Sequence, residues 1–363
     1  MSSAEQWVAL MGRRDAPTDG VTDYCSFLGD ALSTHGIHLK KVRVTWNENG
    51  WTAALRALEA QSEDWRGRWV LLQYTALAWS SRGFPFGALR ALEIVARHGA
   101  HCAVTFHEFS RQPASQRWID RVRGACQDIV IRRMYRRADK TIFTVPIETV
   151  EWVPDDDRKA TFIPIGANIP ERLILRKPTP ADKEKTVAIF GVTGPPSMAS
   201  EVNAIISVVR EAGRSLPGLR LLLVGRGSSD AGLFLTPALR GDGVEVITKG
   251  ILPAEQVAHE LESVDAFLFL RGAVTAQRGS ALAAIACGLP IVGYQNGRVS
   301  HPLDEAGVEW APLGDTGALA RGLVRVLTDK HRWTDLHDRN LRVQQNYFSW
   351  IRIAHQYSTV LSE

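Results

Sequence analysis

A basic residue, a glycine and a serine follow one another where a buried strand should give way to a helix. The apolar run 264–270 has the length of a buried strand, and Arg278-Gly279-Ser280 comes shortly after it. Small residues then predict a helix over 280–287, with Ser280 as its N-cap. The first N–H groups of a helix lack partners inside the helix, and the helix dipole favours negative charge there. Because Arg278 adds a fork of donors suited to phosphate, we expect an anion site at this turn.

Three earlier turns in the second half of the chain have a similar composition. Each follows an apolar run of strand length and contains glycine, and two of them contain a basic residue. One such turn is a weak signal, since any tight strand-to-helix connection needs glycine. In a doubly wound sheet, all four would meet at the carboxyl ends of the strands, where such sheets bind nucleotides. The residues predicted to contact a nucleoside diphosphate-like ligand are Gly191, Thr193, Gly194, Arg226, Lys249, Gly250, Ile251, Arg278, Gly279 and Ser280.

Apolar runs alternate with amphipathic segments along the whole chain, which is typical of parallel sheets built from strand–helix–strand units. The predicted strands are 7–11, 39–44, 69–74, 102–106, 141–145 and 161–163, then 186–190, 219–224, 244–248, 266–270, 290–292 and 308–311. The predicted helices are 22–33, 51–60, 87–96, 117–137, 199–212, 254–261, 280–287 and 316–327. The fold class is therefore α/β.

The size of the chain indicates two domains. A chain of 363 residues exceeds one ordinary core, and turn formers over 164–170 precede a polar, proline-bearing linker. We predict a first domain over 1–170, a second over 171–345, and a C-terminal helix over 346–363 that belongs with the first.

Composition limits the classes of function. The net charge of +4 is too small to suggest nucleic acid as the main partner. No apolar run approaches the ~20 residues that span a bilayer. The N-terminus lacks the pattern of a signal peptide, so we expect a cytoplasmic protein. The four cysteines have no metal-binding spacing, and the run 155–157 is interpreted as a solvated acidic turn, so no metal site is predicted.

The segment Ala286-Cys287-Gly288-Leu289-Pro290-Ile291 resembles the nucleotide-sugar site of the retaining GT-B glycosyltransferases of family 4, also called glycosyl transferases group 1. The resemblance implies two Rossmann-like domains facing each other across a cleft. It also implies transfer of a sugar from a nucleoside diphosphate sugar to an acceptor hydroxyl, with retention, as a hexosyltransferase that requires no metal or other cofactor. The turn at Lys249-Gly250-Ile251 would hold the base through backbone groups.

The sequence departs from the family at two places. Thr275 and Ala283 stand where members commonly carry two glutamates, and the turn 194–197 lacks the cations that often hold the diphosphate. We therefore expect Arg278, supported by Arg226 or Lys249, to neutralise the diphosphate.

The first half carries its own candidate site residues. Gly20 lies in a turn that resembles the family's glycine-rich loop, and Asp19 beside it could bind a sugar hydroxyl or cap the next helix. His107 follows a predicted strand, and the resemblance implies that it contacts the transferred sugar and, with Arg278, supports catalysis. Glu108 is a candidate for acceptor orientation or proton transfer; an exposed loop carboxylate is the alternative.

The long segment 73–83 is predicted to bind the acceptor. It contains Tyr74, Trp79, which could stack on a sugar ring, and Arg82, which could meet an anionic group. Packing within the loop is the alternative for Trp79 and Arg82. A sugar, a lipid-linked oligosaccharide or a small metabolite would all fit as acceptor.

Positively charged residues are concentrated in the predicted helix 117–137. Its arginines form either a solvated helix face or a patch that meets anionic lipid head groups at the inner membrane surface, or a phosphorylated acceptor.

Two other functions fit the same fold. One is a GT-B-type sugar-nucleotide epimerase or hydrolase, and the other is a non-catalytic nucleotide-sugar-binding partner in a polysaccharide-making complex. Turnover of nucleotide sugar without an acceptor would favour the first, and binding without turnover would favour the second.

Overall fold

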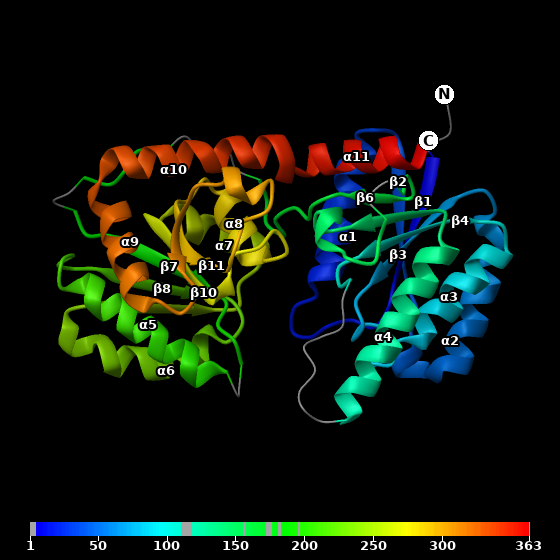
Figure 1. Ribbon diagram of the computed structural model, residues 1–363, viewed down its shortest axis with the longest axis horizontal. Coiled ribbons are helices and arrows are strands. Elements are labelled where there is room, and N and C mark those ends of the chain that lie inside the picture. The colour runs from blue at the N-terminus through cyan, green and yellow to red at the C-terminus, as the bar shows by residue number, and fades with distance from the viewer. Residues whose placement is uncertain are drawn as a thin grey trace. The chain divides into compact units, whose positions relative to one another are not determined.

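A computed structural model describes residues 5–109, 118–154, 157–171, 176–180, 183–194 and 197–362. The chain divides into two compact units, each described here by itself (Figure 1). Unit 1 comprises Met1–Ile165 and Trp350–Glu363, and unit 2 comprises Gly166–Ser349. The division falls within the turn-rich segment 164–170, and the last helix of the chain belongs to unit 1.

Unit 1 is built on a parallel sheet that, in the described residues, has six strands in the order β2-β1-β3-β4-β5-β6. Its strands are β1 (Glu5–Met11), β2 (Ile37–Arg43), β3 (Trp69–Tyr74), β4 (His101–Phe106), β5 (Lys140–Phe143) and β6 (Ala160–Phe162). Its helices are α1 (Gly20–Ser33), α2 (Trp46–Ser62), α3 (Phe86–Arg97), α4 (Trp118–Arg137) and α11 (Trp350–Ser362), with short 3-10 turns η1 (Glu63–Trp65) and η2 (Ile147–Thr149).

Helices cover both faces of this sheet, which explains why its central strands β1, β3 and β4 are largely apolar and buried. Val8 and Leu10 of β1 point into a cluster with residues of α2, α3 and α4. Trp7, Ala9 and Met11 point into a second cluster with residues of α1 and α11. Because successive side chains of a strand alternate between faces, one apolar strand serves two cores.

The C-terminal helix α11 packs on α1 through aromatic side chains. The ring of Trp350 stacks on Phe27 with centroids 5.7 Å apart, and the hydroxyl groups of Tyr24 and Tyr357 lie 2.8 Å apart. Tyr357 also lies 3.0 Å from the hydroxyl of Thr105 in β4. The aromatic pattern of this segment therefore belongs to a core.

Unit 2 repeats the architecture, with a parallel sheet of six strands among the described residues in the order β12-β11-β10-β7-β8-β9. Its strands are β7 (Thr186–Phe190), β8 (Arg220–Val224), β9 (Glu245–Gly250), β10 (Ala266–Ala273), β11 (Ile291–Gln295) and β12 (Val308–Pro312). Its helices are α5 (Met198–Gly213), α6 (Ser228–Leu239), α7 (Ala254–Glu262), α8 (Gly279–Ala286), α9 (Thr316–Thr328) and α10 (Lys330–Val343), with η3 (Arg240–Asp242), η4 (Leu303–Glu305) and the π-helical turn η5 (Gln344–Phe348). Figure 1 shows α5 and α6 on one face of this sheet and α7 and α8 on the other.

The predicted fold class is confirmed: both sheets are parallel, and every predicted strand is present. Helix α6 was not predicted, because it contains Pro237 and exposes Leu233 and Phe234, so its apolar residues do not follow one face. Helix α10 was not predicted either. The predicted N-cap at Ser280 is wrong, since α8 begins at Gly279 with Arg278 at the N-cap.

A few predicted features lie outside the described residues. These are Arg117, at which the predicted basic helix began, Asp155 and Asp156 of the acidic turn, and Pro195 and Pro196 of the turn 194–197. In the part of the chain that the structure describes, no helix combines the length and apolarity needed to cross a bilayer.

Candidate functional site

The strand order of unit 2 contains one switch point, between β7 and β10. From β7 the chain proceeds outward through β8 and β9, and it then returns to add β10, β11 and β12 on the other side of β7. Connections that leave neighbouring strands in opposite directions open a crevice at the carboxyl ends, where doubly wound sheets bind ligands. The loops after β7 and β10 are therefore the place to look for a site.

Arg271, near the end of β10, connects these two strand ends. Its Nη2 donates to the carbonyl of Phe190 at 3.2 Å and to the hydroxyl of Ser280 at 2.7 Å. A Cβ at residue 191 would lie 3.3 Å from Nη1 of Arg271, and Gly191 has φ of 79°. Glycine at this position thus permits both the turn and the close approach of the guanidinium. The sequence analysis did not name Arg271.

The charges around Arg271 are unevenly compensated. Burial lowers the pKa of its guanidinium, the nearby Glu201 raises it, and the positive charge of Arg278 lowers it again. Glu201 is buried in α5 and accepts a hydrogen bond from the backbone N–H of Thr193 at 2.8 Å. Two cations with one carboxylate therefore meet at the N-terminus of α8, whose dipole is itself positive. This arrangement favours an anionic ligand.

The predicted residues at the start of α8 lie together as expected. Arg278 is exposed, and Ser280 is buried against Arg271. A Cβ added to Gly279 would meet nothing within 4 Å among the described residues. The first turn of α8 therefore presents an open backbone beside two guanidinium groups.

The three other predicted turns of unit 2 contact one another through their backbones. Val192 donates from its N–H to the carbonyl of Arg226 at 2.9 Å, and Gly225 donates to the carbonyl of Gly250 at 2.6 Å. A Cβ at Gly227 would lie 2.3 Å from the carbonyl oxygen of Val192, so only glycine fits there. The turns after β7, β8 and β9 thus form one contiguous edge. Thr193 is half-buried, and Gly194, Arg226 and Ile251 are exposed on that edge.

Lys249 is exposed at the end of β9 and forms an ion pair. Its ammonium lies 3.1 Å from a carboxylate oxygen of Glu260 in α7. This carboxylate offsets the charge of Lys249, and the sequence pattern gave no sign of it, because it lies on the helix that follows β9. Support of a diphosphate by Lys249 stays a prediction.

In unit 1, His107 follows β4 and is held by a buried amide. Its Nε2 lies 2.9 Å from Oε1 of Gln73, while Nε2 of Gln73 donates to the carbonyl of Leu71 at 3.3 Å. Because the amide oxygen faces the ring, Nε2 of His107 carries the proton. Burial lowers the pKa of His107 to about 4, so the ring is neutral at pH 7. The edge of the ring meets Tyr24 with centroids 5.0 Å apart.

Glu108 holds the loop that follows β3. Its Oε2 accepts a hydrogen bond from the N–H of Ala76 at 2.8 Å, and the residue is half-buried. The alternative of an exposed loop carboxylate is therefore wrong, and the described contact of Glu108 is structural.

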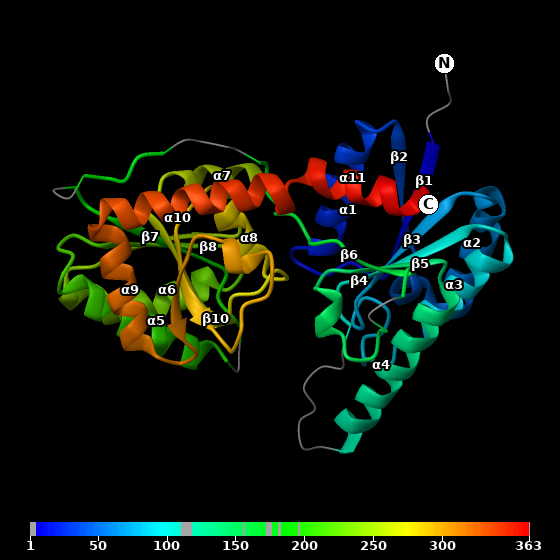
Figure 2. The same cartoon turned by 45° about the horizontal axis from the view of Figure 1, so that its top comes forward.

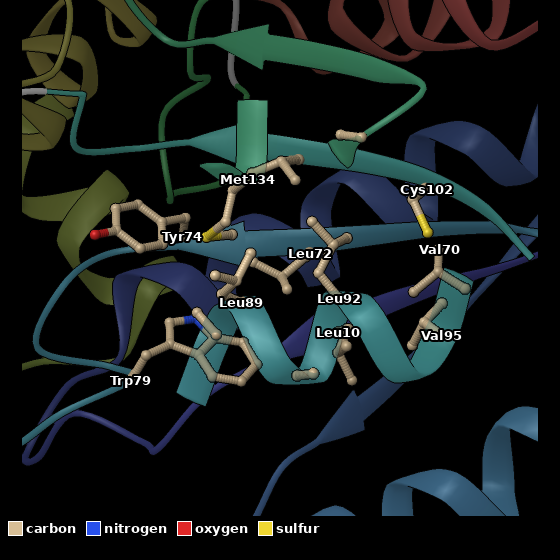
Figure 3. Packing of buried hydrophobic residues seen from close by; sticks show 14 of the residues in the cluster. Leu10, Val70, Leu72, Tyr74, Trp79, Leu89, Leu92, Val95, Cys102 and Met134 are labelled. Carbon is tan, nitrogen blue, oxygen red and sulfur yellow. The ribbon is translucent and has the colours of Figure 1, made fainter. Parts of the chain in front are cut away.

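Two of the predicted acceptor residues lie in the core instead. Figure 3 shows Tyr74 and Trp79 within the apolar cluster, and each has an exposed fraction of 0%. Trp79 donates its indole N–H to the carbonyl of Gln73 at 2.9 Å. Neither ring can offer a face to a sugar, so both predictions are wrong. An aromatic residue at or just beyond a strand end can pack into the core beneath the loop as readily as it can lie on the surface. Arg82 is exposed.

The sequence left two roles open for Asp19, and the structure shows that it caps α1. Its carboxylate accepts from the N–H of Thr22 at 3.2 Å and from the Thr22 hydroxyl at 2.5 Å. Arg43 lies 3.2 Å from the same carboxylate. With Asp19 buried and its oxygens bound, the binding of a sugar hydroxyl is not supported. Gly20 is the exposed first residue of α1.

Comparison with known proteins shows what this geometry is similar to. No protein-family model matches the sequence, and no curated protein matches it. Among solved structures, Anabaena HepE in complex with UDP and glucose is similar with a TM-score of 0.67 and 14% identity, over 99% of both chains. Sucrose-phosphate synthase from Thermosynechococcus elongatus has a TM-score of 0.67 and 19% identity, over 99% of this chain and 98% of that one.

The lipopolysaccharide outer core galactosyltransferase WaaB is similar with a TM-score of 0.63 and 14% identity, over 98% of this chain and 99% of that one. These matches extend over both units, and each unit has the doubly wound parallel sheet that the strand order shows. The chain therefore has the fold of the GT-B glycosyltransferases.

Proposed function

We propose that the protein is a glycosyltransferase that moves a sugar, as a hexosyltransferase, from a nucleoside diphosphate sugar to an acceptor hydroxyl with retention of configuration. One observation carries the proposal: Arg271 and Arg278 lie at the N-terminus of α8, beside the switch point of the unit 2 sheet. Similar structures that hold UDP or UDP-glucose support it.

The electrostatics favour a diphosphate over a neutral ligand. Two guanidinium groups at the positive end of a helix repel each other, and only Glu201 offsets them among the described residues near Arg271. An anion with two phosphoryl groups relieves this repulsion and can accept from both forks. Ile251, 48% exposed at the end of β9, offers an apolar contact to the base on the same edge.

The reaction needs charge stabilisation more than covalent participation. The bond from the anomeric carbon to the diphosphate breaks, and a bond from that carbon to the acceptor oxygen forms. The acceptor proton goes to the departing diphosphate, whose growing negative charge Arg271, Arg278 and the start of α8 stabilise. No step uses a metal or a further cofactor.

Fewer residues of unit 1 are proposed to contact the substrates than the sequence suggested. Because Nε2 of the neutral His107 ring donates to Gln73, Nδ1 is an acceptor, which suits a hydrogen bond from a sugar hydroxyl. Gly20 and Arg82 stay candidates for contacts with donor and acceptor because both are exposed. A sugar, a lipid-linked glycan or a small metabolite remains the proposed acceptor, in polysaccharide or glycosylated metabolite synthesis in the cytoplasm.

Nucleotide binding tests the site on unit 2. Calorimetry would compare a nucleoside diphosphate with its monophosphate for the parent and for Arg271→Gln, Arg278→Gln and Arg321→Gln. We expect the first two substitutions to weaken diphosphate binding by about 2–3 kcal/mol, as for a charge-assisted contact, and to reduce the preference for the diphosphate. Arg321 is exposed on α9 and serves as the matched control. Unchanged affinity in Arg271→Gln and Arg278→Gln would reject the assignment.

Turnover distinguishes transfer from the other functions of this fold. Release of nucleoside diphosphate that requires an added acceptor supports a transferase. Release or sugar interconversion without acceptor supports an epimerase or hydrolase instead. Tight donor binding with no turnover on a panel of sugar and lipid-linked acceptors supports a non-catalytic binding partner.

A further inference from the structure

The outward side of α4 in unit 1 carries a row of arginines. Exposed positions on this helix recur every three or four residues, so they share one side, while Val130, Ile131 and Met134 face the core. We call the exposed side the basic face of α4. Its arginines are Arg121, Arg132, Arg133, Arg136 and Arg137.

Neighbouring acids neutralise only part of the charge of the basic face. Within the described residues, none of its five arginines forms a salt bridge. Asp120 pairs instead with Arg123 at 2.7 Å, and Asp139 accepts from the N–H of Cys102 at 2.7 Å. Half-buried Asp128 of α4 lies four residues before Arg132 and offsets about one of the five charges. The face therefore presents a local excess of positive charge on a chain whose net charge is only +4.

Large apolar side chains share this face with the arginines. Trp118 is 73% exposed, Val122 43% and Ile129 45%. Single exposed apolar residues are normal on a protein surface, but three on one helix face among charged residues are typical of an interaction surface. Figure 2 shows the N-terminal turns of α4, which carry Trp118 and Val122, extending beyond α3 and the sheet of unit 1.

These two properties together identify the kind of partner. A polyanion such as RNA would be held by the arginines but would leave Val122 and Ile129 in water. An anionic bilayer satisfies both, because head groups attract arginine while the interface accepts tryptophan and aliphatic side chains. The helix is already folded on unit 1, so binding requires no ordering of the chain.

We propose that the basic face of α4 docks unit 1 on a membrane surface containing anionic phospholipid. The arginines supply attraction to the head groups, and Trp118, Val122 and Ile129 enter the interface between them. The proposal concerns unit 1 and does not depend on nucleotide binding by unit 2.

Vesicle co-sedimentation of the whole protein tests the proposal. The vesicles contain either phosphatidylcholine alone or phosphatidylcholine mixed with phosphatidylglycerol. We expect binding only to the mixed vesicles, and weaker binding at high salt. Each arginine near an anionic surface contributes about a fivefold gain in binding, so the double variant R133E/R136E should bind at least about 25-fold more weakly.

The matched control carries the same change of charge on unit 2. Arg214 and Arg240 are exposed, and R214E/R240E changes the net charge equally. We expect this control to bind the mixed vesicles nearly as the parent does. Circular dichroism and nucleotide affinity, a property of unit 2, should be unchanged in both double variants.

Substitution of the apolar residues separates a membrane from another polyanion. Trp118→Ser and Ile129→Ser leave the charge unchanged, and each should weaken vesicle binding by about tenfold. Three results would overturn the proposal: no binding of the parent to mixed vesicles at low salt, equal loss in both double variants, or binding of single-stranded RNA without vesicle binding.

Discussion

The neutral state of His107 makes a quantitative prediction about stability and pH. Burial lowers the pKa of His107 from 6.5 to about 4 in the folded protein. Between these values the unfolded chain binds a proton that the folded protein does not, so stability falls as the pH decreases through this window. One pKa unit corresponds to about 1.4 kcal/mol, which limits the total loss to about 3 kcal/mol. Between pH 7.5 and pH 5 the expected loss is about 2 kcal/mol.

The measurement is the free energy of unfolding by urea at the two pH values, for the parent and for His107→Gln. Glutamine does not titrate and can still donate a hydrogen bond to the oxygen of Gln73. We therefore expect the variant to lose about 2 kcal/mol less than the parent on acidification. Other groups titrate equally in both proteins, so their contributions cancel in the comparison. His38→Gln, at an exposed position of β2, is the control and should behave as the parent does.

The ring itself can be followed by nuclear magnetic resonance. The ring-proton signals of His107 should stay at their neutral positions down to about pH 5 if burial controls its protonation. An identical loss of stability in the parent and in His107→Gln would refute the reasoning. It would also remove the basis for a neutral histidine in the proposed sugar contact.

Three other substitutions test the corrected assignments through urea unfolding. Trp79→Ala should cost about 3–5 kcal/mol, as for a large buried aromatic residue, whereas a surface platform would cost almost nothing. Asp19→Ala should cost about 1 kcal/mol through loss of the α1 cap; unchanged stability would contradict the capping role. Gly227→Ala should cost at least about 2 kcal/mol, since its Cβ would meet a carbonyl, and Gly241→Ala, with open space, is its control. Equal stability of these two glycine variants would show that the turn can yield.

The fold was predictable because its signal is distributed over many residues. A parallel sheet buried on both faces needs apolar runs, and those at β1 and β10 are long enough to be recognised without any neighbour. The amphipathic pattern similarly indicated α9. Elements without such a pattern were missed: α6 has Pro237 in its interior and large apolar residues in solvent.

Side-chain direction was much harder to predict than element type. Tyr74 ends an apolar strand and Trp79 follows it, and nothing in their sequence neighbourhood distinguishes a residue that covers a core from one that faces a ligand. The pairing of Lys249 with Glu260 depends on how α7 lies over β9, which sequence spacing does not determine. Predictions that needed only the place of a backbone turn, such as Gly191 and Gly279, depended less on such contacts.

Arg271 shows which signal the sequence did contain. It interrupts the apolar run of β10 near its carboxyl end, in a strand whose preceding residues are fully buried. A charge at that place is costly unless it is paired or faces the open edge of the sheet, and the carboxyl edge is where ligands bind. The apolar run was interpreted as ending at Leu270, so Arg271 was not considered, and the phosphate role was assigned to Arg278 with support from Arg226 or Lys249. Comparison of Arg271→Gln with Arg278→Gln therefore shows which of the two arginines contributes more to diphosphate binding. A larger loss for Arg271→Gln would mean that the strand end, more than the helix N-cap, determines diphosphate affinity.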